Sequence, residues 1–249
     1  MTDDARTFVV SGAGSGIGRA VATALAAGGR HVTAVGRRVE PLESLAGEWA
    51  GRVEVVSADL TVPEDAAAVA ERVRVSSRSC AGVVAAAGGL SPAPEAGSEL
   101  ERVRADWSGS FDSNVLTAVL LVEALRPALE TAGGRVVLLS SVAALRGSGG
   151  GPYGATKAAL HAWAYDLAAD LGRSGGTANV VAPGFVPDTE FWAGRLTEES
   201  TARRAAQTLL GRAGTPHEVA SLIAWLLGPD GGWVTGQVLS PNGGVVLGR

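Results

Sequence analysis

A chain of 249 residues with 46% hydrophobic side chains can bury one sizeable core, which fits a single undivided α/β domain. The net charge of −4 gives no support for a nucleic acid or an anionic membrane surface as a partner. The only cysteine, Cys80, excludes an internal disulfide and fits a reducing compartment.

The N-terminal stretch MTDDARTFVV is acidic and polar before its first apolar run, which is unlike a secretory signal peptide. No apolar run along the chain reaches the roughly 18 residues that a membrane-spanning helix needs. We therefore expect a soluble, cytoplasmic protein with no membrane partner.

Short apolar runs alternate along the chain with longer helical patterns. The short runs are rich in β-branched residues and predict strands at 7–10, 31–35, 53–57, 83–86, 135–139, 178–181 and 237–239. The longer patterns predict helices that end near 27, span 41–50, open at 63, run from about 99 to 126 before Pro127, and span 153–171 and 216–227. Such alternation predicts an α/β fold: a doubly wound, mostly parallel seven-stranded sheet with helices on both faces.

The segment SGAGSGIG, residues 11–18, lies between the first predicted strand and the first predicted helix. Glycines let backbone amides approach a pyrophosphate, and the N-terminus of a helix favours bound anions. Because 35 of the 249 residues are glycine, a chance cluster is the alternative, but the position between strand and helix favours a dinucleotide site. The cofactor-binding candidates here are Gly12, Ser15, Gly16, Ile17 and Gly18.

The second predicted strand ends in Val35-Gly36-Arg37-Arg38. An acidic residue at this place would bond the ribose 2′-hydroxyl of NAD(H), whereas an arginine accommodates the 2′-phosphate of NADP(H). A guanidinium presents a planar set of donors that suits a phosphate. Arg37 and Arg38 therefore predict that NADP(H) is preferred over NAD(H), and the alternative is a pair of solvated surface arginines.

The segment YGATK, residues 153–157, contains the only lysine of the chain, and only one other tyrosine occurs. Residues four apart lie one turn apart on the same helix face, so Tyr153 and Lys157 can serve one site. A nearby ammonium favours the phenolate and is expected to lower the pKa of Tyr153, which suits a residue that donates or accepts a proton. The alternative is a surface pair without a role.

The patterns G-x-x-x-G-x-G and Y-x-x-x-K together resemble the short-chain dehydrogenase/reductase family, in the single-domain branch that includes 3-oxoacyl-acyl-carrier-protein reductases. The resemblance covers nearly the whole chain, and Ser11 stands where the family usually has threonine. It implies one NAD(P)-binding Rossmann domain over residues 1–249. It also implies that Tyr153 donates or accepts the proton and that Lys157 binds the nicotinamide ribose.

The family places a catalytic serine at the end of the fifth strand, where this chain has Ser140 and Ser141. The strand-end motif I-S-S-x-x-G selects Ser141. In the family, the catalytic serine usually lies one residue further from the tyrosine than Ser141 lies from Tyr153. This spacing selects Ser140 instead. We take Ser141 as the catalytic candidate and infer a one-residue deletion in the glycine-rich loop 147–151, since a tight turn loses a residue more easily than a buried strand shifts register.

Two polar residues in other segments also match family positions. Asn114 lies in an apolar helical pattern, where asparagine is unfavourable because it competes for backbone hydrogen bonds. The family has here an asparagine that anchors a water relay to the lysine, and a satisfied structural asparagine is the alternative. Asp59, followed by Leu60, matches the position that meets the adenine ring, and a helix cap is the alternative.

One family motif is altered in this chain. After the fourth strand the family usually has N-N-A-G, whereas residues 85–88 read A-A-A-G. The loss of both asparagines is expected to change local hydrogen bonding more than catalysis. The resemblance still places Ala86, Ala87 and Gly88 beside the cofactor.

The stretch after the sixth predicted strand matches the family's P-G motif beside the nicotinamide. It supplies the candidates Pro183, Gly184 and Val186, and Thr189 is a candidate contact to a cofactor phosphate. No metal site is expected, because the three histidines have no partners at the spacing of metal ligands.

The resemblance implies an NADPH-dependent reductase that transfers a hydride to a ketone, with Tyr153 as the proton donor. The substrate would be a 3-oxoacyl compound or another small carbonyl, selected by a lid at about 187–212 that contains Trp192. The alternatives are an NAD(P)-dependent alcohol dehydrogenase working in the oxidative direction and a catalytically silent dinucleotide-binding sensor. The family also implies a homotetramer or homodimer, often formed through the C-terminal helices and strand.

Overall fold

The computed structural model describes residues 5–90 and 97–248, and the rest of the predicted domain 1–249 lies outside this part. Within it, seven strands form one sheet in the order β3-β2-β1-β4-β5-β6-β7, and every neighbouring pair is parallel. The strands are β1 Arg6–Ser11, β2 His31–Gly36, β3 Val53–Ser57, β4 Ser79–Ala85, β5 Arg135–Leu139, β6 Thr177–Val181 and β7 Val238–Leu239. The order reverses direction between β1 and β4, so a ligand crevice is expected at the carboxyl ends of these two strands.

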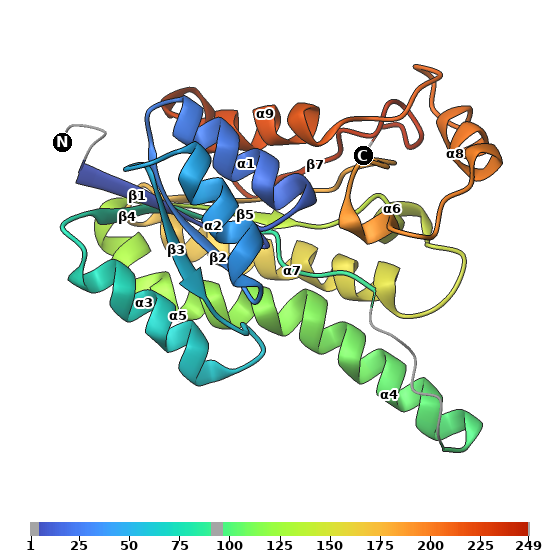
Figure 1. The fold of residues 1–249 in the computed structure, drawn as a ribbon, viewed down its shortest axis with the longest axis horizontal. Helices are drawn as coiled ribbons and strands as arrows, with labels where there is room; N and C mark the ends of the chain where they lie inside the picture. The colour runs from blue at the N-terminus through green and yellow to red at the C-terminus, as the bar shows by residue number, and fades with distance from the viewer. Residues whose placement is uncertain (1–4, 91–96, 249) are drawn as a thin grey trace.

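Helices cover both faces of this sheet (Figure 1). The α-helices are α1 Gly16–Ala27, α2 Val39–Glu48, α3 Pro63–Val75, α4 Glu99–Phe111, α5 Thr117–Ala132, α6 Ala143–Arg146, α7 Tyr153–Gly172, α8 Glu198–Ala205 and α9 Pro216–Leu227. The shorter helical turns are η2 Asp112–Leu116, η3 Glu190–Trp192 and η4 Pro229–Gly231. The predicted doubly wound α/β fold is confirmed.

The core consists of two apolar layers, one on each side of the sheet. Leu121, Leu160 and Leu167 from α5 and α7 pack with α3 against one face. On the other face Leu25 and Ile223 belong to a layer formed by α1, α2 and α9. The strands between them are buried on both sides, which explains why they read as continuous apolar runs in the sequence.

The helix predicted from about 99 to 126 differs from the structure in two ways. A π-helical turn, η2, interrupts it between α4 and α5, and α5 continues through Pro127 to Ala132. The expectation that the helix stops before Pro127 is therefore wrong. Fully buried Leu129 anchors the extra turn in the core, and Gly133 ends the helix in a left-handed conformation at φ 59°. These two features offset the cost of placing a proline inside a helix, which is about 3 kcal/mol.

Other boundaries shift by smaller amounts. The strand β4 begins at Ser79 rather than at 83, because pairing with β1 includes Ser79 and Cys80 although neither is β-branched. The short helix α6 was not predicted.

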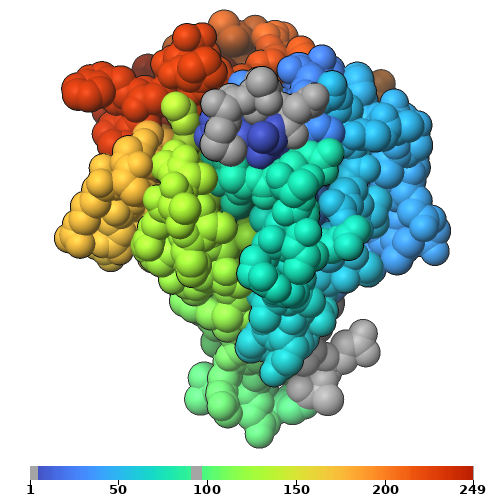
Figure 2. Space-filling model, turned by 90° about the vertical axis from the view of Figure 1, so that its left-hand side faces the viewer, coloured from blue at the N-terminus to red at the C-terminus, as the bar shows by residue number. Residues whose placement is uncertain are grey.

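The N-terminal part of α4 extends beyond the sheet and its covering helices, and it forms the green projection at the base of Figure 2. Among the described residues, no helix combines the length and apolar character needed to cross a membrane.

Candidate active site

A cavity of about 870 Å³ opens at the carboxyl ends of β1, β4, β5 and β6. It is bounded by the glycine-rich loop, the start of α7 and the segment 187–212 that was predicted to be a lid. Most of the predicted site residues line it: Gly12, Ser15, Gly16, Ile17, Gly18, Ala86, Ala87, Gly88, Ser141, Tyr153, Lys157, Pro183, Gly184, Val186 and Thr189. The candidates outside its lining are Arg37, Arg38, Asp59, Leu60 and Asn114.

The glycine-rich loop runs tightly from β1 into α1. A β-carbon on Gly18 would lie only 2.3 Å from the carbonyl oxygen of Gly12, and Gly12 itself has a φ of 66°. Larger residues are therefore excluded at both positions. Ser15 precedes the first turn of α1 without capping it through its side chain, so the amides at this helix N-terminus lie at the edge of the cavity.

Ser11 connects the glycine-rich loop to the end of β4. Its hydroxyl accepts hydrogen bonds from the backbone amides of Ala86 and Ala87 at 3.1 and 3.0 Å, and it donates to the carbonyl of Val84 at 3.5 Å. Because Ser11 is almost fully buried, its hydroxyl depends on these backbone groups for its hydrogen bonds. The A-A-A-G segment is thus held by a serine hydroxyl.

Asn114 holds the following part of the same loop. It lies in the π-helical turn η2 and is 1% exposed. Its Nδ2 donates to the carbonyl of Gly89 at 2.8 Å, and its Oδ1 accepts from the amide of Gly89 at 3.0 Å. A β-carbon on Gly88 would lie 2.6 Å from Asn114 Oδ1 and 3.1 Å from Lys157 Nζ. Asn114 therefore positions the loop against Lys157 without lining the cavity, and a π-turn at such a place is typical of functional sites.

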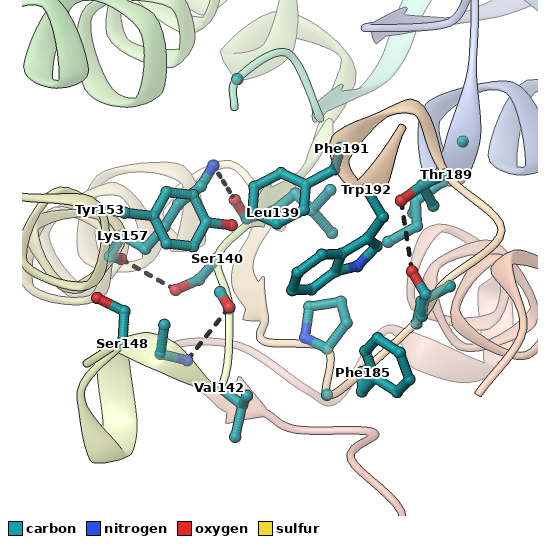
Figure 3. A pocket seen from close by; sticks show the side chains of 18 of the residues that line it. Leu139, Ser140, Val142, Ser148, Tyr153, Lys157, Phe185, Thr189, Phe191 and Trp192 are labelled. Atoms are coloured by element: carbon teal, nitrogen blue, oxygen red, sulfur yellow. Dashed lines mark hydrogen bonds between the residues drawn. The ribbon is translucent and has the colours of Figure 1, made fainter. Parts of the chain in front are cut away.

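Tyr153 and Lys157 lie on the first two turns of α7 and face the cavity (Figure 3). The side chain of Ser141 lies near the phenol of Tyr153 and acts to lower its pKa. The ammonium of Lys157 donates to the carbonyl of Leu139 at the end of β5, at 2.9 Å. The structure thus brings the predicted serine, tyrosine and lysine together in one place.

The two consecutive serines after β5 have different surroundings. Ser140 is buried, where its hydroxyl donates to the backbone carbonyl of Lys157 at 3.0 Å and shares a 2.8 Å hydrogen bond with His161 Nε2. Ser141 reaches Tyr153 and accepts from the amide of Ala143 at 3.2 Å. Consecutive residues of an extended chain point in opposite directions, so only one of the pair can face the phenol.

Burial dominates the ionisation of the tyrosine and the lysine. It raises the pKa of Tyr153, although Ser141 nearby acts in the opposite direction, and it lowers the pKa of Lys157 to about 8. The expectation that Lys157 lowers the pKa of Tyr153 is therefore not met in this structure. The physical reason is that desolvation disfavours both charged forms, while the ammonium is directed at the carbonyl of Leu139.

The candidates for binding the adenosine part of the cofactor lie outside the cavity: Arg37 and Arg38 are exposed on the surface, and Leu60 is buried in the core. The guanidinium of Arg38 pairs with Glu190, and the charge of Arg37 helps to lower the pKa of Asp59. The larger causes of that shift are hydrogen bonds to the carboxylate from the amide and hydroxyl of Thr61, at 3.1 and 2.8 Å.

Asp59 does not cap the next helix, because α3 begins at Pro63 with Val62 as its N-cap. The helix-cap alternative for Asp59 is therefore wrong. The side chain of Leu60 is buried in the core, so any contact from this residue to a cofactor would come from its backbone.

An aromatic cluster that the motifs did not indicate covers the catalytic side of the cavity. The ring of Phe191 lies 5.3 Å from that of Tyr153 and 4.9 Å from that of Trp192. Trp192 in turn contacts Phe185 at 5.5 Å, and the guanidinium of Arg204 lies 4.7 Å from its ring. Trp192 was expected in the pocket and lines it. The run E-F-W in an otherwise polar segment is the only sequence signal for Phe191.

A model of the protein family described as "Enoyl-(Acyl carrier protein) reductase" matches residues 12–246 of this chain. The chain belongs to the short-chain dehydrogenase/reductase family. It is 32% identical to Nodulation protein G of Rhizobium sp. (strain N33), over 97% of both proteins. It is 28% identical to 3-oxoacyl-[acyl-carrier-protein] reductase FabG of Escherichia coli (strain K12), over 99% of this chain and 100% of that one.

Solved structures agree with this assignment. A short-chain dehydrogenase/reductase from Brucella melitensis, described as a glucose/ribitol dehydrogenase, superimposes with a TM-score of 0.88 at 29% identity, over 98% of both chains. The predicted family and Rossmann-type fold are confirmed. The protein is an NAD(P)-dependent oxidoreductase that acts on carbonyl or alcohol substrates. The close glycine contacts and the N-terminus of α1 fit a nicotinamide dinucleotide.

Proposed function

We propose that this oxidoreductase is an NADPH-dependent carbonyl reductase that converts a 3-oxoacyl compound or another small ketone to an alcohol. The observation that carries the proposal is the placement of Ser141, Tyr153 and Lys157 around one cavity, with Ser141 close enough to the phenol to act on its pKa. This cavity also contains the glycine-rich loop, so a bound dinucleotide and a carbonyl substrate can meet beside the phenol.

Each of these side chains has a separate task in the reaction. The bound nicotinamide supplies the hydride. Ser141 donates a hydrogen bond to the substrate carbonyl oxygen and so fixes it beside Tyr153, which gives its phenolic proton to that oxygen. Lys157 binds the cofactor ribose from the next turn of α7, and Asn114 keeps the loop at Gly88 against Lys157.

The ionisation state of Tyr153 fits the role of a proton donor. Because burial raises the pKa of this phenol above its usual value near 10, the side chain holds its proton at neutral pH. A proton donor must start in that state. Because the same residues would serve alcohol oxidation, the proposed reductive direction rests on the NADP(H) preference.

The cofactor preference rests on the exposed arginines after β2. Arg37 and Arg38 provide two positive charges at the end of the strand that faces the adenosine ribose in a doubly wound fold. The substrate class rests on two supports. FabG, a relative that covers nearly the whole chain, is named as a 3-oxoacyl-acyl-carrier-protein reductase, and Phe185, Phe191 and Trp192 make the substrate side of the cavity apolar.

The assembly we propose is a homotetramer or homodimer formed through the C-terminal region. Trp233 in this region is 98% exposed, and Trp225 on α9 is 42% exposed. A second copy that covers these rings would remove a large apolar area from water. Light scattering of the purified protein tests the proposal, and a Trp233→Glu variant is expected to shift the mass towards the monomer. A wild-type monomer would contradict it.

A serine pair provides a sharp test of the catalytic arrangement. Ser141→Ala is expected to lower kcat for ketone reduction about 100-fold or more, because it removes the donor to the developing oxyanion, while NADPH binding persists. Ser140→Ala is the matched control, since its hydroxyl bonds the backbone carbonyl of Lys157 and the ring of His161, and it is expected to keep most of the turnover. Equal losses in the two variants would contradict the assignment. Tight cofactor binding by the wild type without turnover on a broad panel of ketones would favour the sensor alternative.

A further inference from the structure

The segment 187–212 rests directly on the cofactor loop through two consecutive residues. A β-carbon on Gly16 would lie 3.1 Å from that of Thr189, so Thr189 packs against the first turn of α1. The carboxylate of Glu190 is 2.5 Å from the guanidinium of Arg38, and the side chain of Ser15 lies near enough to act on the pKa of this carboxylate. The lid and the predicted phosphate-binding groups are therefore already in contact.

Glu190 uses the same donors that a phosphorylated cofactor would use. Ser15 stands at the N-terminus of α1, where backbone amides and the helix dipole favour an anion. Arg38 follows β2, at the place where the 2′-phosphate of NADP(H) is expected. The hydrogen bond from Arg38 and, to a smaller extent, the side chain of Ser15 lower the pKa of Glu190, so it is ionised at neutral pH. An internal carboxylate thus occupies positions suited to phosphate oxygens.

We propose that Glu190 is a specificity-determining residue whose carboxylate competes with the 2′-phosphate of NADP(H) for Arg38. The inference rests on the NADP(H) preference proposed above. Glu190 must leave Arg38 before the phosphate can pair with it, so the native protein binds NADPH more weakly than its arginines alone would allow. NADH has no 2′-phosphate and does not need Arg38, so Glu190 affects its binding less.

The position of Glu190 also connects cofactor binding to the catalytic tyrosine. Glu190, Phe191 and Trp192 form the single helical turn η3, and the ring of Phe191 lies against that of Tyr153. Displacement of Glu190 by a phosphate therefore moves η3 and the ring that covers the phenol. It follows that NADPH binds before the ketone, because the substrate side of the cavity is rearranged by the cofactor.

The test is calorimetric titration of NADPH and NADH into the wild type and Glu190→Gln, in the absence of a ketone. Glutamine keeps the size of the side chain and one acceptor oxygen, and it removes the charge. We expect Glu190→Gln to bind NADPH about three- to fivefold more tightly, the effect of losing one exposed ion pair, and NADH less than twofold more tightly. The matched control is Glu199→Gln, an exposed glutamate on α8, which is expected to change neither affinity.

A double-mutant cycle identifies the competing group. In an Arg38→Gln background, Glu190→Gln is expected to have no further effect on NADPH affinity, because the shared partner is absent. Unchanged or weaker NADPH binding by Glu190→Gln would overturn the inference. An equal gain in affinity for NADPH and NADH would also overturn it, because the competition would then be with the pyrophosphate that both cofactors share. A wild type that binds NADH more tightly than NADPH would refute the proposed cofactor preference itself. Because both side chains of the pair are about half exposed, the variants are expected to fold, which a thermal melt checks.

Discussion

Replacing Lys157 by methionine is expected to stabilise the cofactor-free protein while it abolishes turnover. Lys157 is 4% exposed, and burial lowers its pKa from 10.5 to about 8. A shift of this size disfavours the ammonium in the folded state by roughly 3 kcal/mol. The lost hydrogen bond to the carbonyl of Leu139 costs about 1 kcal/mol. The net gain at pH 7 is therefore about 2 kcal/mol, which for a chain of this size raises Tm by about 4–8 °C.

The pH dependence of this gain in stability shows whether it comes from the desolvation of the Lys157 ammonium. The folded pKa of Lys157 lies below the unfolded one, so the unfolded chain binds the proton more tightly and the wild type gains stability as the pH rises from about 8 to 10.5. Scanning calorimetry of both proteins at pH 7 and pH 10.5 should show that the advantage of methionine shrinks over this window. Lys157→Arg is the control, since it keeps its charge at both pH values. A methionine variant less stable than the wild type at pH 7, or an advantage that does not change with pH, would refute the reasoning.

Three further predictions concern the core, the thiol and the glycine-rich loop. Leu129→Ala should lower the free energy of unfolding by about 2–5 kcal/mol in urea titrations, because this fully buried side chain anchors α5 beyond Pro127, and a loss below 1 kcal/mol would argue against that anchor. Burial raises the pKa of Cys80 to about 12, so a thiol reagent at pH 8 should label it only after unfolding, and rapid labelling of the native protein would contradict this. Gly18→Ala should weaken NADPH binding more than tenfold, because its β-carbon would lie 2.3 Å from the carbonyl oxygen of Gly12, whereas Gly47→Ala, with open space around it, should leave binding unchanged.

Much of the fold could be predicted because its signals are local. The strands β3 and β5 and the helix α9 begin and end as expected, since each is an apolar run or periodic pattern bounded by residues that favour turns or caps. The course of α5 through Pro127 could not be predicted, because burial of Leu129 in the core outweighs the local preference of proline.

The candidate site was likewise only partly predictable from the sequence. The motifs selected the residues of one cavity, but they left two serines open, and only the direction of the chain after β5 shows which of them reaches Tyr153. The ion pair between Arg38 and Glu190 joins residues 152 positions apart. No periodicity or spacing in the sequence indicates such a contact, since it depends on how the segment 187–212 folds back over the glycine-rich loop.

The measurement that tests the central claim most directly is NADPH oxidation at 340 nm with a panel of ketones, for the wild type and Tyr153→Phe. The phenylalanine variant keeps the ring and its contact with Phe191 and loses only the hydroxyl that donates the proton. We predict that the wild type oxidises NADPH with at least one ketone of the panel. Tyr153→Phe should bind NADPH with similar affinity and reduce that ketone at least about 100-fold more slowly. Equal turnover by the two proteins would contradict the assignment of Tyr153 as the proton donor.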